Sequence, residues 1–172
     1  MTNKSQIKLC LLGIFTVLSM KQWPTLFLKS VIYLIGLAVL GICVIIAGVS
    51  ISGNGGMYLS ILIIAEVAAI PFFYALYQGI LLLQYIDQNT AFSEMSVKAI
   101  KNIKNCAFTI SVIYAAEMPY MVYVADKDDA PGAVVIGLVF IFAPLITSVF
   151  AAVLQKLLQK AIDIKSENDL TV

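Results

Sequence analysis

The chain has 172 residues, of which 61% are hydrophobic and only 12% charged, and its mean hydropathy is +0.97. Several apolar runs approach the roughly 20 residues needed to cross a bilayer, so the composition predicts an all-α integral membrane protein. Eleven lysines and ten acids give a net charge of +1, which excludes a strongly basic surface for direct nucleic-acid binding. Histidine is absent and there are three cysteines, so the sequence predicts no metal site and no cofactor.

Residues 1–24 precede the first long apolar run. Within them, the run from Leu9 to Leu18 follows Lys4 and Lys8, is too short to span a membrane, and is similar to the core of a signal peptide. An uncleaved helix lying on the membrane surface is one interpretation of this segment. An upstream extension of the reading frame is another, since Met20 is a plausible start; in both cases the membrane domain occupies 25–172.

The apolar runs that follow predict a four-helix bundle of membrane-spanning helices. A glycine-rich turn at 52–56 and an Asp-rich turn at 126–132 make two short connections, and a longer polar connection lies at 87–102. Short connections favour antiparallel neighbours. The four predicted spans are at about 26–51, 57–86, 103–124 and 133–158.

Lysines are distributed unevenly between the two sides of these spans. Only Lys127 falls on the side of the two short turns. Lysines close to span ends are retained in the cytoplasm, so both termini and the middle connection are predicted to be cytoplasmic in a bacterial inner (cell) membrane. The ten lysines on the predicted cytoplasmic side are Lys4, Lys8, Lys21, Lys29, Lys98, Lys101, Lys104, Lys156, Lys160 and Lys165.

Two glutamates, Glu66 and Glu117, lie inside predicted spans, each shortly before a proline. A charged group there costs roughly 2.5 to 3.5 kcal/mol or more, so such a residue faces a wet or protein-lined interior. Counted from the span ends, both lie about 13 Å deep. With the hydroxyls of Tyr114 and Tyr120 they form a hypothetical proton or ligand site. A buried, hydrogen-bonded clasp of the two carboxyls is the alternative.

Apolar stripes continue beyond two of the spans on the predicted cytoplasmic side. Ser93 is a suitable N-cap for a helix that begins before the third span, and the fourth helix is expected to overrun the bilayer. These extensions predict a docking surface for a soluble partner, and packing among lipid headgroups is the alternative. The docking candidates are Val97, Ile100 and Ile103, together with Leu154, Leu157 and Leu158.

Enzymatic activity is not expected, and no catalytic residue is assigned. Intramembrane metalloproteases need histidine ligands, and acyl or phosphoryl transfer normally recruits histidine or arginine. Neither residue type occurs in this chain.

The loop and tail sequences resemble those of one protein family. Residues 82–87 and 92–98, and the tail 167–172, are similar to the domain-of-unknown-function family 2975, and the likeness extends over about 20–172. The resemblance implies a small bacterial four-helix membrane protein whose partner is a helix-turn-helix regulator. The preferred hypothesis is therefore a membrane regulatory or interaction protein. A small transporter or ion- or proton-binding protein centred on the two glutamates is the alternative, and immunity to membrane-active peptides is a third.

Overall fold

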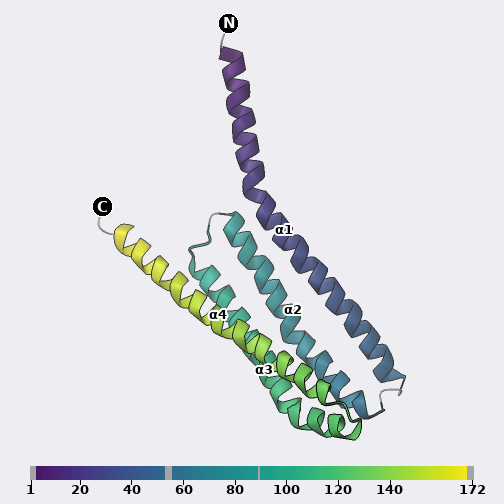
Figure 1. Cartoon of the computed structure of the whole chain (residues 1–172). Helices are drawn as coiled ribbons and strands as arrows, with labels where there is room; N and C mark the ends of the chain where they lie inside the picture. Colours follow the sequence, from purple (N-terminus) through teal and green to yellow (C-terminus); the bar gives the residue numbers. More distant parts are fainter. Residues whose placement is uncertain (1–2, 53–55, 89, 170–172) are drawn as a thin grey trace.

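The computed structural model describes the backbone of residues 3–52, 56–88 and 90–169, and the side chains of 25–52, 56–88 and 90–167. Within these ranges all regular secondary structure is helical and there is no strand, as predicted (Figure 1). The helices are α1 (Asn3–Ile51), the short 3₁₀ helix η1 (Gly56–Tyr58), α2 (Leu59–Asp87), α3 (Glu94–Lys127) and α4 (Pro131–Asp169).

Four helical segments are long and apolar enough to cross a membrane, which confirms the prediction of four spans. They are Thr25–Ile51, Gly56–Asp87, Glu94–Lys127 and Pro131–Glu167. α1 begins at Asn3, so the backbone of the N-terminal segment is continuous with the first span. The side chains of 1–24 and most of the glycine-rich turn, residues 53–55, lie outside the described residues.

Consecutive helices run antiparallel, so both ends of the chain and the α2–α3 connection lie at one end of the molecule (Figure 1). Extensive contacts join sequence neighbours: α1 with α2, α2 with α3, and α3 with α4. α3 is therefore packed on two sides, whereas α1 lies at an edge. In agreement with this order, α3 contains most of the buried residues, and no residue of 25–52 is buried.

The start of α3 shows why this helix begins before the membrane span. Ser93 has extended backbone angles, and its Oγ accepts a hydrogen bond from the Ser96 N–H at 3.4 Å. This is the predicted N-cap, which satisfies a backbone donor that has no partner within the helix. Glu94 in the first turn is favoured by the helix dipole, as Lys127 is in the last turn.

Polar side chains fix the register between α3 and α4. The Ser111 hydroxyl donates to the Ile141 carbonyl at 2.9 Å, and the Ser148 hydroxyl donates to the Lys104 carbonyl at 3.1 Å. The Lys104 ammonium donates to Gln155 Oε1 at 3.2 Å. Hydrogen bonds between helices are the means by which membrane helices satisfy polar side chains that lipid cannot. They hold α4 against α3 between Ile141 and Gln155.

Candidate functional site

Glu117 lies in the C-terminal half of α3 and is the one acidic residue among the buried core positions of the described chain. Its side chain is 5% exposed, and its Oε1 atom is buried with no hydrogen-bond partner. A buried polar atom without a partner costs about 1 to 3 kcal/mol relative to one in water. An ionisable residue kept in such a position marks a candidate functional site.

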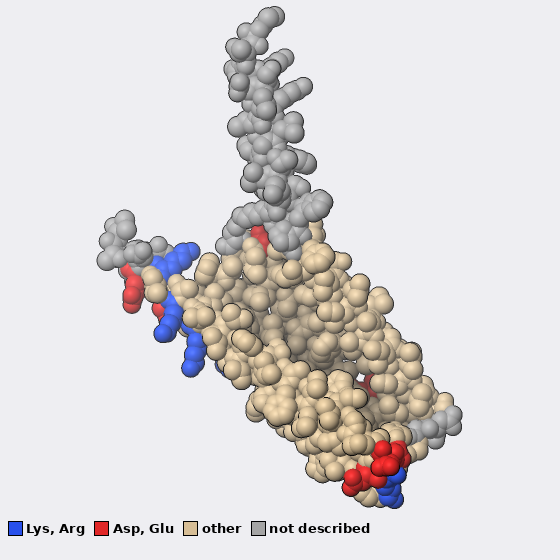
Figure 2. Space-filling view, in the orientation of Figure 1, with Lys and Arg blue, Asp and Glu red and all other residues tan. Residues whose placement is uncertain are grey.

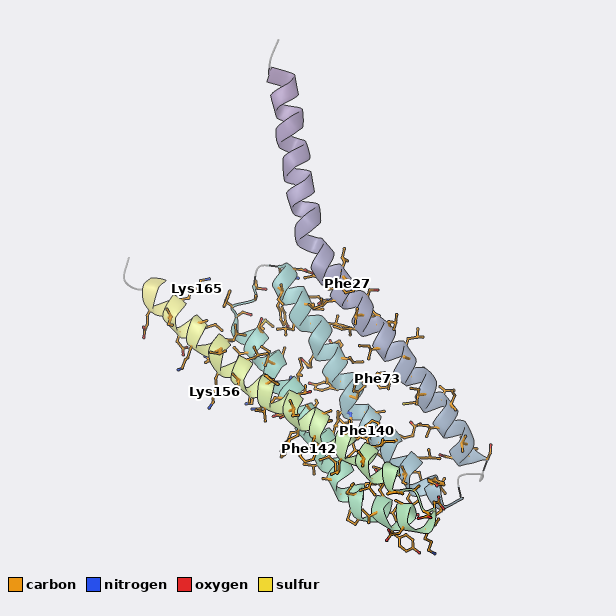
Figure 3. All side chains as sticks on the ribbon, viewed as in Figure 1. Phe27, Phe73, Phe140, Phe142, Lys156 and Lys165 are labelled. Carbon is orange, nitrogen blue, oxygen red and sulfur yellow. The ribbon has the colours of Figure 1, made fainter. Side chains whose placement is uncertain are left out.

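The Glu117 carboxyl borders a cavity of about 130 Å³ between α2, α3 and α4. The rings of Tyr114 and Phe140 (labelled on α4 in Figure 3) form part of its wall, with centroids 5.4 Å apart and planes inclined at 33°. The remaining wall is apolar. The residues that line the cavity are Ile61 and Ala65 of α2, Tyr114, Glu117, Met118 and Met121 of α3, and Gly137 and Phe140 of α4.

Gly137 explains how two methionines fit into this wall. A Cβ at position 137 would lie 2.7 Å from Met121 Sδ and 3.2 Å from Met118 Sδ, closer than van der Waals contact allows. Glycine at this point lets both thioethers lie against the α4 backbone. The two sulfur atoms therefore lie close to α4 in the wall of the cavity.

Glu66, the second predicted site residue, is only partly buried on α2. Its Oε1 atom is nevertheless enclosed and has no hydrogen-bond partner. In the described part of the chain no hydrogen bond joins its carboxyl to that of Glu117, so the predicted clasp is not formed. The sequence prediction treated these two residues alike, but the structure gives them different surroundings.

Cys43 of α1 carries a free thiol and is half-buried. Free cysteine behaves as a small apolar packing residue, so its position in the first span assigns it no role at this site.

The predicted role of Tyr120 is corrected by the structure. Its hydroxyl donates to the Met57 carbonyl at 2.8 Å, and the residue does not line the cavity. Tyr120 therefore joins α3 to η1 at the end of the molecule. Tyr120 lies three residues beyond Glu117 along α3, and its hydroxyl therefore reaches η1, which precedes the start of α2.

The predicted docking residues fall into two groups. Val97 is 9% exposed and is covered by its own chain, so it offers no surface to a partner; Ile100 and Ile103 are half-buried. On α4, Leu154 and Leu157 are 55% and 59% exposed, and Leu158 is half-buried. The accessible part of the predicted surface is therefore on α4.

Charged side chains are concentrated at the two ends of the molecule. Lysines lie along the C-terminal part of α4, where Lys156 and Lys165 are labelled in Figure 3, and acidic side chains lie among them; at the opposite end a cluster of acidic side chains lies beside a lysine (Figure 2). Among the described residues, no group of three or more His, Cys, Asp or Glu side chains is placed to hold a metal ion.

Comparison with known proteins supports the sequence resemblance. The family described as "Protein of unknown function (DUF2975)" matches residues 54–172, a shorter stretch than the expected 20–172. An "Uncharacterized membrane protein YoaS" from Bacillus subtilis (strain 168) is 52% identical over 160 residues, covering 89% of this chain and all of the relative. No solved structure matches the chain.

Proposed function

We propose, from the premise that the chain belongs to the DUF2975 family of proteins of unknown function, that it is a non-enzymatic regulatory membrane protein that binds a soluble partner. Its membrane is a bacterial cell membrane, with both termini in the cytoplasm. The distribution of lysines supports this orientation, because Lys127 is the one lysine among the described side chains that lies at the α3–α4 connection, and the others lie towards the opposite end.

The observation that carries the docking proposal is the exposed apolar surface late in α4. At 1.5 Å per residue, the 39-residue helix is about 58 Å long, against about 30 Å of hydrocarbon in a bilayer. Leu154 and Leu157 lie beyond the first 20 residues of α4 and are more than half exposed. This part of α4 therefore extends past the membrane core on the lysine-rich side.

The charges beside these leucines indicate the chemistry of the partner. Lys156 and Lys160 are exposed next to the apolar residues. A partner with an apolar helix face bordered by acidic residues complements such a surface. A cytoplasmic helix-turn-helix regulator that presents such a helix is the partner we propose.

A photoreactive amino acid at position 157 tests this proposal in cells. We expect a covalent adduct with a soluble protein, lost when Leu154 is changed to Glu, because a buried carboxylate opposes docking. The same reagent at Phe92, which is exposed at the same end of the molecule, is the matched control. Adducts with lipid alone at position 157 would show that α4 packs among headgroups and would contradict the docking proposal.

A second candidate function is binding or transport of a proton or cation, and the buried, unpartnered carboxyl of Glu117 favours it. An exchangeable charge is what such a mechanism uses, so Glu117→Gln should abolish flux in proteoliposomes while preserving the fold. Glu94→Gln, an exposed position on the same helix, is the control. Unchanged flux in Glu117→Gln contradicts this candidate and leaves the docking proposal unaffected.

A further inference from the structure

We infer that the Glu117 cavity is a binding site for a small organic cation of the methylated-ammonium class. The inference rests on the second candidate function and names its ligand. It is drawn from the cavity between α2, α3 and α4, and it does not involve the docking surface on α4.

The first support is the unpartnered carboxyl. Glu117 is only 5% exposed and borders the cavity. Its Oε1 atom is buried and accepts no hydrogen bond. No lysine is among the cavity-lining residues. The wall of the cavity therefore contains a carboxyl group but no positively charged side chain. A bound cation would provide the positive charge that this carboxyl group lacks.

The walls indicate an organic cation instead of a metal ion. Calcium takes six to eight oxygen ligands, and magnesium requires near-octahedral oxygen coordination. The lining residues offer one carboxyl and the Tyr114 hydroxyl as side-chain oxygen donors. Ring faces attract alkylated ammonium groups, and the rings of Tyr114 and Phe140 lie side by side in the wall. The polarizable thioethers of Met118 and Met121 suit the methyl groups of such a ligand.

The size of the cavity restricts the ligand to a few heavy atoms. An apolar protein cavity of roughly 150 Å³ can admit benzene. A cavity of about 130 Å³ therefore accommodates a compact head group such as a quaternary ammonium. Large lipophilic cations are excluded unless the helices separate.

Charges near the cavity favour the approach of a cation. The lining residues come from the start of α2, the end of α3 and the start of α4, so the cavity is closer to the α3–α4 connection than to the lysine-rich end. Asp126, Asp128 and Asp129 lie at this connection with only Lys127 between them, and Figure 2 shows the acidic end. Such a surplus of negative charge raises the local concentration of cations.

Titration calorimetry with tetramethylammonium chloride on the full chain in nanodiscs tests the inference. We expect saturable binding, and we expect tert-butanol, a neutral molecule of similar shape, to bind much more weakly. Glu117→Gln should weaken tetramethylammonium binding by about tenfold or more, because each 1.4 kcal/mol changes the dissociation constant tenfold. Glu94→Gln on the exposed start of α3 should have no effect.

A second pair of variants tests the cavity without changing any charge. In Gly137→Ala the new Cβ displaces the two methionine sulfurs, so the cavity changes shape and binding should weaken. Gly132→Ala is the matched control on α4, since nothing lies within 4 Å of its Cβ position. This pair keeps the inference testable if Glu117→Gln fails to fold.

Three results would overturn the inference: no saturable binding of tetramethylammonium, equal binding of tert-butanol, or unchanged binding in both Glu117→Gln and Gly137→Ala. If tetramethylammonium does not bind while proton flux still depends on Glu117, the second candidate function stands and only the ligand class is wrong. If it binds without any flux, the cavity is a binding site and transport is contradicted.

Discussion

The α3–α4 and α1–α2 interfaces both join helices long and apolar enough to span a membrane, but they differ in what they bury. α3 buries ten of its residues, including Ser96, Ser111 and Glu117, and is joined to α4 by hydrogen bonds between helices. α1 buries none of the described residues. An ion pair between Lys29 and Asp87, at 2.5 Å, links it to α2 with both side chains partly exposed. α3 is thus the structural core, and α1 is an apolar edge.

The composition of the helices explains this difference. α1 is the most apolar of the four candidate spans and α3 the least. Lipid offers no hydrogen bonds, so a helix that carries serines and a glutamate is stable in a membrane only when other helices surround it. In this protein the least apolar span therefore occupies the centre, which reverses the arrangement expected in water.

The largest contrast between the two interfaces should appear on truncating their apolar side chains. Ile110→Ala removes a buried side chain of α3 and should lower the free energy of unfolding by about 2 to 5 kcal/mol, because it leaves a cavity. Ile35→Ala on α1 removes a side chain that is already 40% exposed and should cost much less. Reversible unfolding in mixed micelles measures both, and equal losses would contradict the assignment of α3 as the core.

Replacing the buried acid should have the opposite sign. Glu117→Met keeps a similar volume and removes an unpartnered polar atom, so the free energy of unfolding should rise by about 1 to 3 kcal/mol. Glu66→Met should raise it less, since Glu66 is only partly buried. The same unfolding measurement checks both variants. A loss of stability in Glu117→Met would indicate that Glu117 has a partner in solution.

The hydrogen bonds between helices should make a smaller contribution. Ser148→Ala removes the bond to the Lys104 carbonyl and should lower the free energy of unfolding by about 0.5 to 1.5 kcal/mol. Thr147→Val is the neighbouring control, because the Thr147 hydroxyl bonds within its own helix, to Ala143, at 2.9 Å. Equal effects of the two changes would show that the bond between helices does not stabilise the α3–α4 interface.

The ion pair between α1 and α2 should have the smallest effect. Lys29→Met should change stability little, and the change should vanish at high salt, because exposed charges are screened. The charge swap Lys29→Asp with Asp87→Lys should restore the original value. Unfolding curves at low and high salt measure the effect, and a large salt-independent loss would mean that this end of α1 is more tightly packed than its exposure indicates.

Much of the fold could be predicted from the sequence, because the evidence for it is local. The four candidate spans, the Ser93 cap and the length of α3 and α4 beyond their predicted spans follow from apolar run lengths and from residue types at helix ends. The unusual position of Glu117 was also visible, since a carboxyl in an apolar run is rare whatever surrounds it.

The surroundings of each site residue were decided only by the tertiary structure. Helical spacing shows which residues share a face, but it does not show which neighbouring helix covers that face. Only packing could place Tyr114 beside the cavity and Tyr120 at η1, and bury Val97. The sequence by itself therefore determined an all-α membrane protein with an acid in its interior. The tertiary structure decided which acid is buried and what borders it, because burial in a helical protein depends on contacts between segments far apart in the chain.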